Sequence, residues 1–366
     1  MSDQDLKKTA LNDWHRARDA KMVGFAGYEL PVTYPLGLRG EHEACRNAAA
    51  LFDVSHMGQV SVTGPGAVAY LESILPLNCA DLALGKQAYS FLLNADGGVL
   101  DDLMCARLGD TLDDTRFELV VNGACKAADL AHMQAQATGF DVSLQVRERA
   151  LIALQGPRAA EALAQTDLKA ATDLKFMEVC EPLPGYGVSR SGYTGEDGFE
   201  IALPNADVAA ICDQLCGHDF VEPAGLGARD SLRLEAGLCL YGQDLDTSIT
   251  PLDASLGWAV PKNRSGYLGA EKLAAQRAGS PDYALIGLLP EGRAPWRAGV
   301  KLFDGEGQEV GLVTSGTFSP TLDRPIALAR VQRAAAKADQ FIGELRGKRV
   351  PCQRTKLPFV KKSYAK

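Results

Sequence analysis

Short runs of alternating apolar and polar residues, separated by Gly, Pro, Asn or Asp, dominate the first part of the chain. This period of two predicts β-strands, and the turn-forming segment Asn94–Gly98 between two such runs predicts a hairpin. The predicted strands are Gln59–Thr63, Tyr89–Leu93, Leu100–Leu108 and Arg116–Val121. Between and after them, apolar residues at helical spacing predict helices. The predicted helices are Gly66–Leu75, Lys126–Gln136, Pro157–Ala164, Asn205–Gly217 and Gly227–Gly237.

From residue 283 onward the pattern is almost entirely one of short strands with turns between them. This spacing predicts a small barrel or sandwich of about 85 residues. A less regular stretch, residues 270–281, precedes it, so we expect a domain boundary near residues 275–283. Strands and helices before it do not alternate strictly, which predicts an α+β fold. The predicted late strands are Tyr283–Leu289, Val300–Phe303, Glu309–Thr314, Ile326–Val331 and Phe341–Leu345.

Composition excludes several classes of protein. With 366 residues, 46% hydrophobic and 23% charged, the chain is typical of a globular protein of two or three domains. A net charge of −8 argues against a general nucleic-acid binder. No apolar run approaches the ~18 residues of a membrane span, and the N-terminus resembles neither a secretion signal nor a transit peptide. Nine cysteines without a C-x-x-C pair predict reduced, mostly buried thiols, so we expect a cytoplasmic protein.

The usual motifs of nucleotide-binding proteins, zinc proteases and serine hydrolases are missing from the sequence. Gly225 and Gly227 lack the third glycine of a dinucleotide-binding loop. Among five scattered histidines, only His56 lies in a dense mixture of polar and apolar residues. A structural role is the simpler interpretation of His56, and a place in a binding site is the alternative.

Two adjacent carboxylates, Asp101 and Asp102, lie at the start of an apolar predicted strand. Neighbouring side chains of a strand point to opposite faces, so we expect one of the two to point inward. A buried, unpaired carboxylate has a raised pKa and can act as an acid, a base or the partner of a cation. A solvated pair of turn and cap residues at the hairpin end explains the same pattern equally well.

The segment Arg190–Glu200 combines three glycines with two aromatic residues and three acids. Glycines let a ligand approach the backbone, Tyr193 and Phe199 could stack on a flat ring, and Glu200 could accept paired hydrogen bonds from an amino-heterocycle. Taken alone, an ordinary hairpin with acidic turn residues is the simpler interpretation.

A third segment, residues 225–244, places Arg229 and Arg233 on one face of a predicted helix. Asp230 lies three residues before Arg233, which suits a local ion pair on a charged helix face. The alternative is a guanidinium that holds a carboxylate or a substrate.

Together these segments closely resemble the glycine cleavage T-protein family of tetrahydrofolate-dependent aminomethyltransferases. The resemblance covers nearly the whole chain, and the combination of motifs is highly specific although each motif is weak alone. One small departure is Tyr28, where many family members carry Trp. The matching motifs are Lys21–Gly27, Leu51–Met57, Gly97–Asp102, Leu154–Pro157, Gly192–Glu200, Ala228–Gly237 and Thr314–Pro320.

The resemblance implies an α+β, three-lobed, cloverleaf-like architecture around a central folate channel, with a small C-terminal β-barrel. We accordingly expect a folate-binding region over residues 1–275 and a barrel domain over residues 283–366. Within the first region, one lobe is expected from residues 1–50 plus 140–275 and a second from residues 51–139.

The resemblance also implies which residues form the site. Asp102 matches the family's catalytic aspartate near the pterin ring. Substrate-contacting positions match Glu200, Arg229 and Tyr364. Folate-binding positions match Tyr89, Asn122, Tyr193, Glu200 and Trp258.

The implied reaction moves the methylene group of an S-aminomethyl-dihydrolipoyl carrier protein, the H protein of the glycine cleavage system, to tetrahydrofolate. Folate N5 attacks the methylene, ammonia leaves and the dithiol is released, while Asp102 assists charge development near N5. The protein would act mainly by positioning two reactants. The resemblance thus implies tetrahydrofolate as co-substrate, a lipoylated carrier as partner, and no metal, flavin, nucleic acid or membrane.

Other proteins on this scaffold leave two alternatives: a folate-dependent demethylase of a small methylated donor, and a non-enzymatic folate-binding module. Oxidising fusion enzymes need a further nucleotide-binding domain, whose motif is missing here. An iron–sulfur maintenance protein carries Lys-Gly-Cys-Tyr-x-Gly-Gln, whereas this chain reads Gly-Leu-Cys-Leu-Tyr-Gly-Gln over residues 237–243. Turnover of an aminomethylated carrier separates the remaining alternatives.

The acidic total conceals one basic segment, residues 346–366, which contains eight basic residues and no acid. It is either a solvated edge of the last barrel strands or a surface that attracts an anionic reactant, such as the glutamate tail of folate or an acidic carrier. Its basic residues are Arg346, Lys348, Arg349, Arg354, Lys356, Lys361, Lys362 and Lys366.

Overall fold

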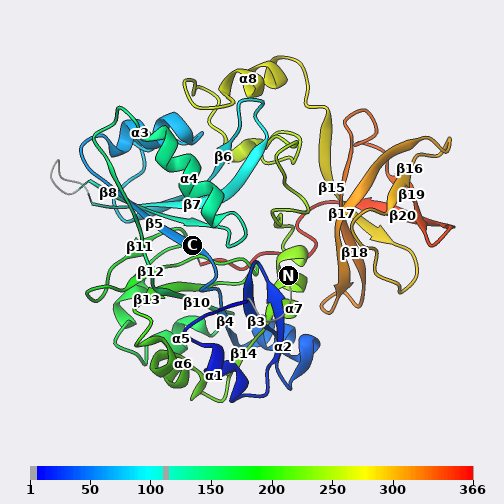
Figure 1. Cartoon of the computed structure of the whole chain (residues 1–366). Coiled ribbons are helices and arrows are strands. Elements are labelled where there is room, and N and C mark those ends of the chain that lie inside the picture. The colour runs from blue at the N-terminus through cyan, green and yellow to red at the C-terminus, as the bar shows by residue number, and fades with distance from the viewer. Residues whose placement is uncertain (1–5, 110–114, 366) are drawn as a thin grey trace.

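The structure is a computed structural model of the chain and describes residues 6–109 and 115–365. Two lobes, each built on a β-sheet with helices packed against it, lie together, and a closed β-barrel stands beside them (Figure 1). This arrangement confirms the predicted α+β class, with three lobes and a small C-terminal barrel. A further small sheet near the N-terminus consists of β1 (Lys7–Lys8), β3 (Tyr28–Thr33) and β2 (Lys21–Phe25).

The first lobe contains a six-stranded sheet. Its strands, in sheet order, are β11 (Val179–Cys180), β12 (Gly187–Ser189), β13 (Gly198–Leu203), β10 (Ala150–Gln155), β4 (Ala49–Asp53) and β14 (Val221–Pro223). Its helices are α1 (Asn12–Arg16), α2 (Gly37–Asn47), α5 (Ala159–Leu163), α6 (Val208–Cys216) and α7 (Leu226–Glu235), with the 3₁₀-helix η2 (Lys169–Asp173).

Strand β10 runs through the middle of this sheet and is buried along its whole length. Ile152 and Leu154 share a core with α5 and α6, whereas Leu151 and Ala153 share a second core with α2 and α7. A strand covered on both faces has a continuous apolar run instead of an alternating one.

The second lobe contains a five-stranded sheet and two helices. In sheet order the strands are β6 (Lys86–Leu93), β7 (Val99–Gly109), β8 (Arg116–Val121), β5 (Gly58–Thr63) and β9 (Ser143–Val146), and the helices are α3 (Ala67–Ile74) and α4 (Lys126–Gln136). Alternate apolar residues of β5 and β8 share one core with α3 and α4. The predicted hairpin is confirmed, because β6 pairs with β7 and the amide of Asn94 donates to the carbonyl of Gly98 at 2.9 Å.

The chain passes between the two sheets at residues 54–57 and again at residues 147–149, as the membership of β4, β5, β9 and β10 shows. These crossings lie a few residues beyond the lobe limits expected at residues 50 and 140. The predicted limits of the lobes as domains stay predictions.

A helix, α8 (Ala270–Ala278), forms within the stretch that the sequence pattern left less regular. The buried residues of this 9-residue helix are Ala270, Leu273 and Gln276. Because two of them are apolar, its apolar stripe is narrow and the helical period in the sequence is weak. A 3₁₀-turn, η3 (Gly257–Ala259), lies earlier in the same connection. Among the described residues, no helix combines the length and the apolar character needed to cross a membrane.

The barrel closes six strands, one more than the sequence predicts. In barrel order they are β15 (Tyr283–Pro290), β18 (Arg324–Gln332), β17 (Glu309–Ser319), β16 (Lys301–Phe303), β19 (Gln340–Leu345) and β20 (Lys348–Thr355). Strand β20 escaped prediction because it is rich in charge and buries only Cys352. Trp296 fills the barrel interior, and a Cβ atom at Gly343 would lie 2.2 Å from its ring, so this position requires glycine.

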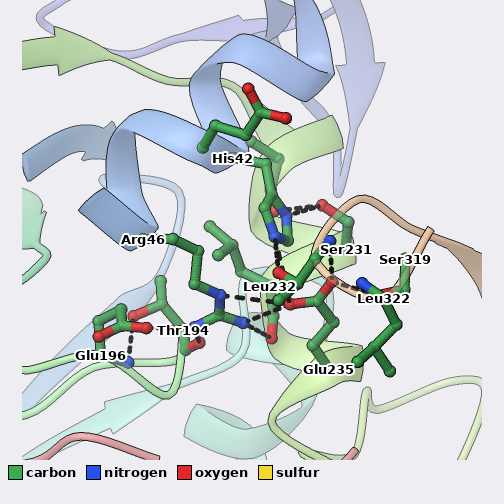
Figure 2. A network of polar contacts seen from close by, with 12 residues as sticks. His42, Arg46, Thr194, Glu196, Ser231, Leu232, Glu235, Ser319 and Leu322 are labelled. Carbon is green, nitrogen blue, oxygen red and sulfur yellow. Dashed lines mark hydrogen bonds and ion pairs between the residues drawn. The ribbon is translucent and has the colours of Figure 1, made fainter. Parts of the chain in front are cut away.

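A buried carboxylate, Glu235 at the end of α7, joins the first lobe to the barrel (Figure 2). It accepts a hydrogen bond from Arg46 of α2 at 2.8 Å and lies 3.2 Å from Nε2 of His42. Ser319, at the end of β17, and Thr321, in the turn after it, donate to the same carboxylate. Burial alone would raise the pKa of Glu235, but the hydrogen bonds from His42, Ser319 and Thr321 outweigh it and lower the pKa to about 2.

Two residues earlier on α7, Arg233 makes a second connection to the barrel. Its guanidinium is fully buried and donates to Asp244 at 2.8 Å and to Ser315 of β17 at 3.0 Å. It also donates to Asp230 at 2.9 Å, as the spacing of three residues predicts. For Arg233, therefore, the ion-pair interpretation is correct, and its partners include a residue of the barrel.

After β20 the chain returns to the first lobe as a strap, residues 356–365, which is red in Figure 1. The amide of Val360 donates to the carbonyl of Glu235 at 2.9 Å, and that of Ser363 donates to Gly195 at 2.9 Å. The hydroxyl of Ser363 donates to Glu196, whose carboxylate also accepts from Arg46 at 2.7 Å. The strap therefore ties the end of the chain to the network around Glu235.

Replacing Glu235 by alanine is expected to destabilise the whole molecule. The change leaves the buried guanidinium of Arg46 without one of its carboxylate partners and should lower the free energy of unfolding by about 3 kcal/mol or more. Urea denaturation measures the loss. Glu43→Ala is the matched control, because Glu43 forms an exposed ion pair with Arg39 on α2, the helix that carries Arg46. For this control a change below ~0.5 kcal/mol in the free energy of unfolding is expected. Equal effects in the two variants would contradict the role given to Glu235.

Candidate active site

The two large sheets face each other across a cavity of about 60 Å³. Phe199 and Ile201 of β13 lie in the core of the first lobe, so Glu200 between them points the opposite way and lines the cavity. From the second sheet, Met104 of β7 and Val120 of β8 line the same cavity. The alternation of these strands therefore places a carboxylate between the sheets.

The adjacent acids of β7 have different surroundings. Asp101 is fully buried, and its carboxylate accepts from both the backbone amide and the side-chain amide of Asn122, each at 2.8 Å. Asp102 is half-buried; it accepts from the side chain of Asn122 at 2.8 Å and from the hydroxyl of Tyr89 at 2.8 Å. The expectation of one inward-pointing acid is correct, and a solvated turn pair is excluded.

Burial and the negative charge of Asp101 raise the pKa of Asp102 to about 7, although Tyr89 and Asn122 oppose this rise by donating to the carboxylate. A group that titrates near neutral pH can both take and return a proton. Asp102 therefore has the acid–base properties of a catalytic carboxyl group.

An exposed aromatic surface lies beside Asp102. The indole of Trp258, in η3, is 74% exposed and stacks on the ring of Tyr89, with centroids 5.9 Å apart and planes 21° apart. The other side of Tyr89 meets the edge of Phe91 at 5.0 Å. An indole held flat but open to solvent can stack on a planar ring.

In the first lobe, Arg229 of α7 lies over the ring of Tyr193, with its guanidinium carbon 4.7 Å from the ring centroid. The Tyr193 hydroxyl donates to the carbonyl of Cys239. Nitrogen Nη1 of Arg229 is buried and has no hydrogen-bond partner, so it can bind an acceptor from a ligand. Burial lowers the pKa of Arg229, whereas the charge of Glu200 raises it, which indicates that these two residues act on each other.

The predicted site residues form two groups that face each other. Asp102, Tyr89 and Asn122 are joined by direct hydrogen bonds. Tyr193, Arg229 and Glu200 come from the first lobe, and the charge of Asp102 contributes to raising the pKa of Tyr193 above its usual range. Glu200 itself accepts from the hydroxyl of Ser191 at 3.0 Å.

Tyr364 has a different setting. It lies in the strap and stacks on Phe176, with ring centroids 4.1 Å apart and planes 8° apart. Its contact with a substrate stays a prediction. Lys362, two residues before it, is half-buried, and burial lowers its pKa while Cys239 raises it. The strap thus brings a cation toward Cys239, whose carbonyl Tyr193 binds.

Two polar residues close to Asp101, Cys125 and Asp129, are not among the site residues that the sequence predicts. One carboxylate oxygen of Asp101, one of Asp129 and the thiol of Cys125 lie within 4.8 Å of one another, the only such cluster of metal-ligand atoms in the described part of the chain. A signal was available, since Asp129 and Met133 are the buried residues of α4 and lie four positions apart. An acid in the apolar stripe of a helix is such a signal.

His56 is buried, and its atom Nδ1 has no partner. Burial and the charge of Arg229 lower its pKa to about 4, so the imidazole is neutral at pH 7. The edge of its ring meets Phe25 at a centroid distance of 5.5 Å. His56 is therefore packed in the interior and also lies near Arg229. Its structural role and its place beside the predicted site are compatible.

Both parts of the fold match models of known protein families. The GCVT N-terminal domain matches residues 11–264, and the glycine cleavage T-protein C-terminal barrel domain matches residues 284–361. Together, the fold and these matches define a transferase with the domain arrangement of the glycine cleavage T proteins.

Similar proteins extend along the whole chain. An aminomethyltransferase of Chromobacterium violaceum is 41% identical over 97% of this chain and 97% of its own length, and a mitochondrial aminomethyltransferase of Dictyostelium discoideum is 40% identical over 100% and 95%. The crystal structure of the glycine cleavage system aminomethyltransferase T of Bartonella henselae superposes with a TM-score of 0.94 at 45% identity, covering 99% of this chain and all of that one. The chain therefore belongs to the glycine cleavage T-protein family, and the predicted family and enzyme class, aminomethyltransferase, are confirmed.

The hydroxyl of Tyr89 should keep the pKa of Asp102 from rising further. Tyr89→Phe removes this donor from the carboxylate and is expected to raise the pKa of Asp102 by roughly one pH unit, because a hydrogen bond to a charged group is lost. Carboxyl ¹³C NMR across a pH titration measures the change. Tyr186→Phe is the control, since Tyr186 donates to Asp207 at the same distance of 2.8 Å. An Asp102 midpoint that does not move in Tyr89→Phe would refute the assignment.

Proposed function

We propose that the chain catalyses aminomethyl transfer in the glycine cleavage system: the methylene of an S-aminomethyl-dihydrolipoyl carrier protein passes to tetrahydrofolate, and ammonia is released. One observation carries the proposal for the site. The carboxyl group of Asp102, with a pKa near 7, is held by Tyr89 and Asn122 at the junction of the two lobes, in a chain that belongs to a family of aminomethyltransferases.

The residues of the site suit a reduced pterin. The exposed face of Trp258 offers a stacking surface, and the carboxylate of Glu200 can accept the paired N–H donors of an amino-heterocycle. The unpartnered Nη1 of Arg229 can donate to a carbonyl or an anionic group. A folate has a flat ring, amino groups and anionic groups in one molecule. The three kinds of contact that the site offers therefore support tetrahydrofolate as the co-substrate.

The balance of protons explains the need for Asp102. In the proposed reaction, tetrahydrofolate supplies the nucleophilic N5 and loses two N–H protons, one of which ends on the carrier thiol and the other on ammonia. A group near N5 that accepts and returns a proton at neutral pH lowers the barrier to both transfers. Asp102 meets this requirement because burial and Asp101 raise its pKa to about 7.

Positioning is the other contribution of the protein. The reactants arrive on separate molecules, and holding them in a reactive geometry removes much of the entropic barrier. Residues from both lobes surround the site, and α7, anchored to the barrel through Arg233 and Glu235, holds Arg229 in place. The relative position of the lobes therefore sets the geometry of the reaction.

Asp102→Asn tests the chemical role. The change keeps the shape and removes the titrating group, so kcat should fall by about 100-fold or more while folate binding changes little. Turnover is measured as methylene-tetrahydrofolate and ammonia formed from aminomethylated carrier, and binding as quenching of Trp258 fluorescence. Asp96→Asn, in the exposed turn of the same hairpin, is the control and should behave as wild type.

Three results would each replace part of this proposal. Wild-type turnover by Asp102→Asn would remove Asp102 from the chemistry. Turnover with a small methylated donor but not with the carrier would identify a demethylase. Binding of folate without turnover of either substrate would identify a binding module.

The basic segment divides into two parts in the structure. Arg346, Lys348 and Arg349 surround the turn between β19 and β20 of the barrel, whereas Lys361 and Lys362 lie in the strap beside the first lobe. Lys366 lies outside the described residues. We propose that the strap part, and not the barrel turn, attracts an acidic lipoylated carrier, because it is the part that reaches the site region.

Charge reversal at one exposed lysine tests this docking proposal. Lys361→Glu should raise the KM for the carrier several-fold at low ionic strength, with the effect shrinking as salt is added and with kcat little changed. Lys348→Glu, which makes the same change at the barrel turn, is the matched control. An equal KM in both variants at every salt concentration would argue against docking at the strap.

We also propose that the enzyme needs no metal or flavin and works in the cytoplasm. All nine cysteines are free and seven of them are buried, as predicted, which suits a reducing compartment. Turnover of the purified protein should survive a chelator unchanged. A loss of activity that a divalent metal restores would contradict the metal-free proposal.

A further inference from the structure

A second carboxyl group lies behind the acids of β7. Asp129, in the first turn of α4, is 2% exposed, and one of its oxygens lies within 4.8 Å of a carboxylate oxygen of Asp101 and of the thiol of Cys125. Asp101 is itself fully buried. Two carboxyl groups therefore face each other in the interior of the second lobe.

The hydrogen bonds around this pair are incomplete if both groups are charged. Asp101 accepts two hydrogen bonds from Asn122, but atom Oδ2 of Asp129 is buried and has no donor. Within residues 6–109 and 115–365, no lysine or arginine forms an ion pair with Asp101, Asp102 or Asp129. Two uncompensated charges at this distance are very costly, and one proton held between the groups removes the cost.

We propose that Asp101 and Asp129 share one proton, which resides on Asp129 and is donated in a hydrogen bond to Asp101, and that this pair positions Asn122 and thereby Asp102. The remaining charge on Asp101 fixes Asn122 from behind, through its backbone and side-chain amides. The same side-chain amide donates to Asp102 at 2.8 Å. Asp129 is thus a positioning residue that acts through two others.

The ionisable surroundings agree with one shared proton. Burial and the charge of Asp101 raise the pKa of Asp129 to about 9, and burial also raises the pKa of Asp101. The ionisable groups that act on the pair are Asp102 on β7, Cys125 at the N-cap of α4 and Tyr241 in the connection after α7. Since the groups in this set are acids when they ionise, each of them favours retention of the proton.

The pair also affects the pKa of Asp102. Burial raises the pKa of Asp101, the hydrogen bonds from Asn122 and Asp129 oppose this rise, and the charge of Asp101 raises the pKa of Asp102. Without a donor at position 129, Asp101 takes up a proton, no longer accepts both hydrogen bonds from Asn122, and ceases to repel a charge on Asp102. The pKa of Asp102 then falls.

Two substitutions at Asp129 separate these effects. Asp129→Ala removes the donor, so kcat should fall by about tenfold, and the acid limb of the pH–rate profile should move to lower pH. Asp129→Asn keeps a permanent donor and should lower kcat by about twofold at most, with the acid limb unmoved. Asp81→Asn, at an exposed acid of the same lobe, is the control. Equal losses in both Asp129 variants, with no movement of the acid limb, would overturn the proposal.

A measurement without turnover keeps this test separate from that of the proposed function, on which the role of Asp102 rests. In an Asp102→Asn background at pH 8, infrared spectroscopy should show the carbonyl band of a protonated carboxylic acid, and adding Asp129→Asn should abolish it. A missing band would overturn the shared proton. A rise in melting temperature on adding Mg²⁺ or Zn²⁺ that Asp129→Asn abolishes would overturn it too, because the cluster would then hold a cation.

Discussion

The buried carboxylate of Glu235 is the contact on which the joining of the first lobe to the barrel depends. It lies at the end of α7, and Arg46 of α2 and Ser319 and Thr321 of the barrel donate to it. A charge at such a depth is tolerated only when its partners are in place, so the first lobe and the barrel fit together in one way. Arg233, two residues earlier, makes a similar contact with β17. The same helix carries Arg229, so the anchoring of α7 also determines where that guanidinium meets the site.

The site depends on opposition between two sheets more than on any single motif. Glu200 faces the second sheet because its neighbours in β13 face the core of the first lobe. Asp102 reaches the junction from the other side, and Tyr89 and Asn122 restrain it. In the proposed reaction this one carboxyl group carries out the acid–base chemistry, and the remaining residues hold ring systems and charges in position. An enzyme that joins two carried groups gains most from such positioning.

Much of the fold followed from local pattern, and the exceptions have local causes. Helix α4 begins and ends as its apolar spacing predicts. Strand β20 was missed because its charged residues face solvent on the barrel surface, and α8 because its apolar stripe is narrow. Asp129 lies in the apolar stripe of α4, four positions before Met133, but this position by itself marks a buried acid and not its partner. Its significance comes from Asp101, 28 positions earlier, which strand pairing and helix packing bring opposite it.

The sequence by itself determined the class of fold and the family, since these follow from periodicity and from motifs that stay together in the chain. It also determined that Asp101 and Asp102 point to opposite faces. Only the tertiary structure decided which of the two is fully buried, and which one titrates near pH 7. Burial and charge depend on what packs against each face, and those partners come from distant parts of the chain.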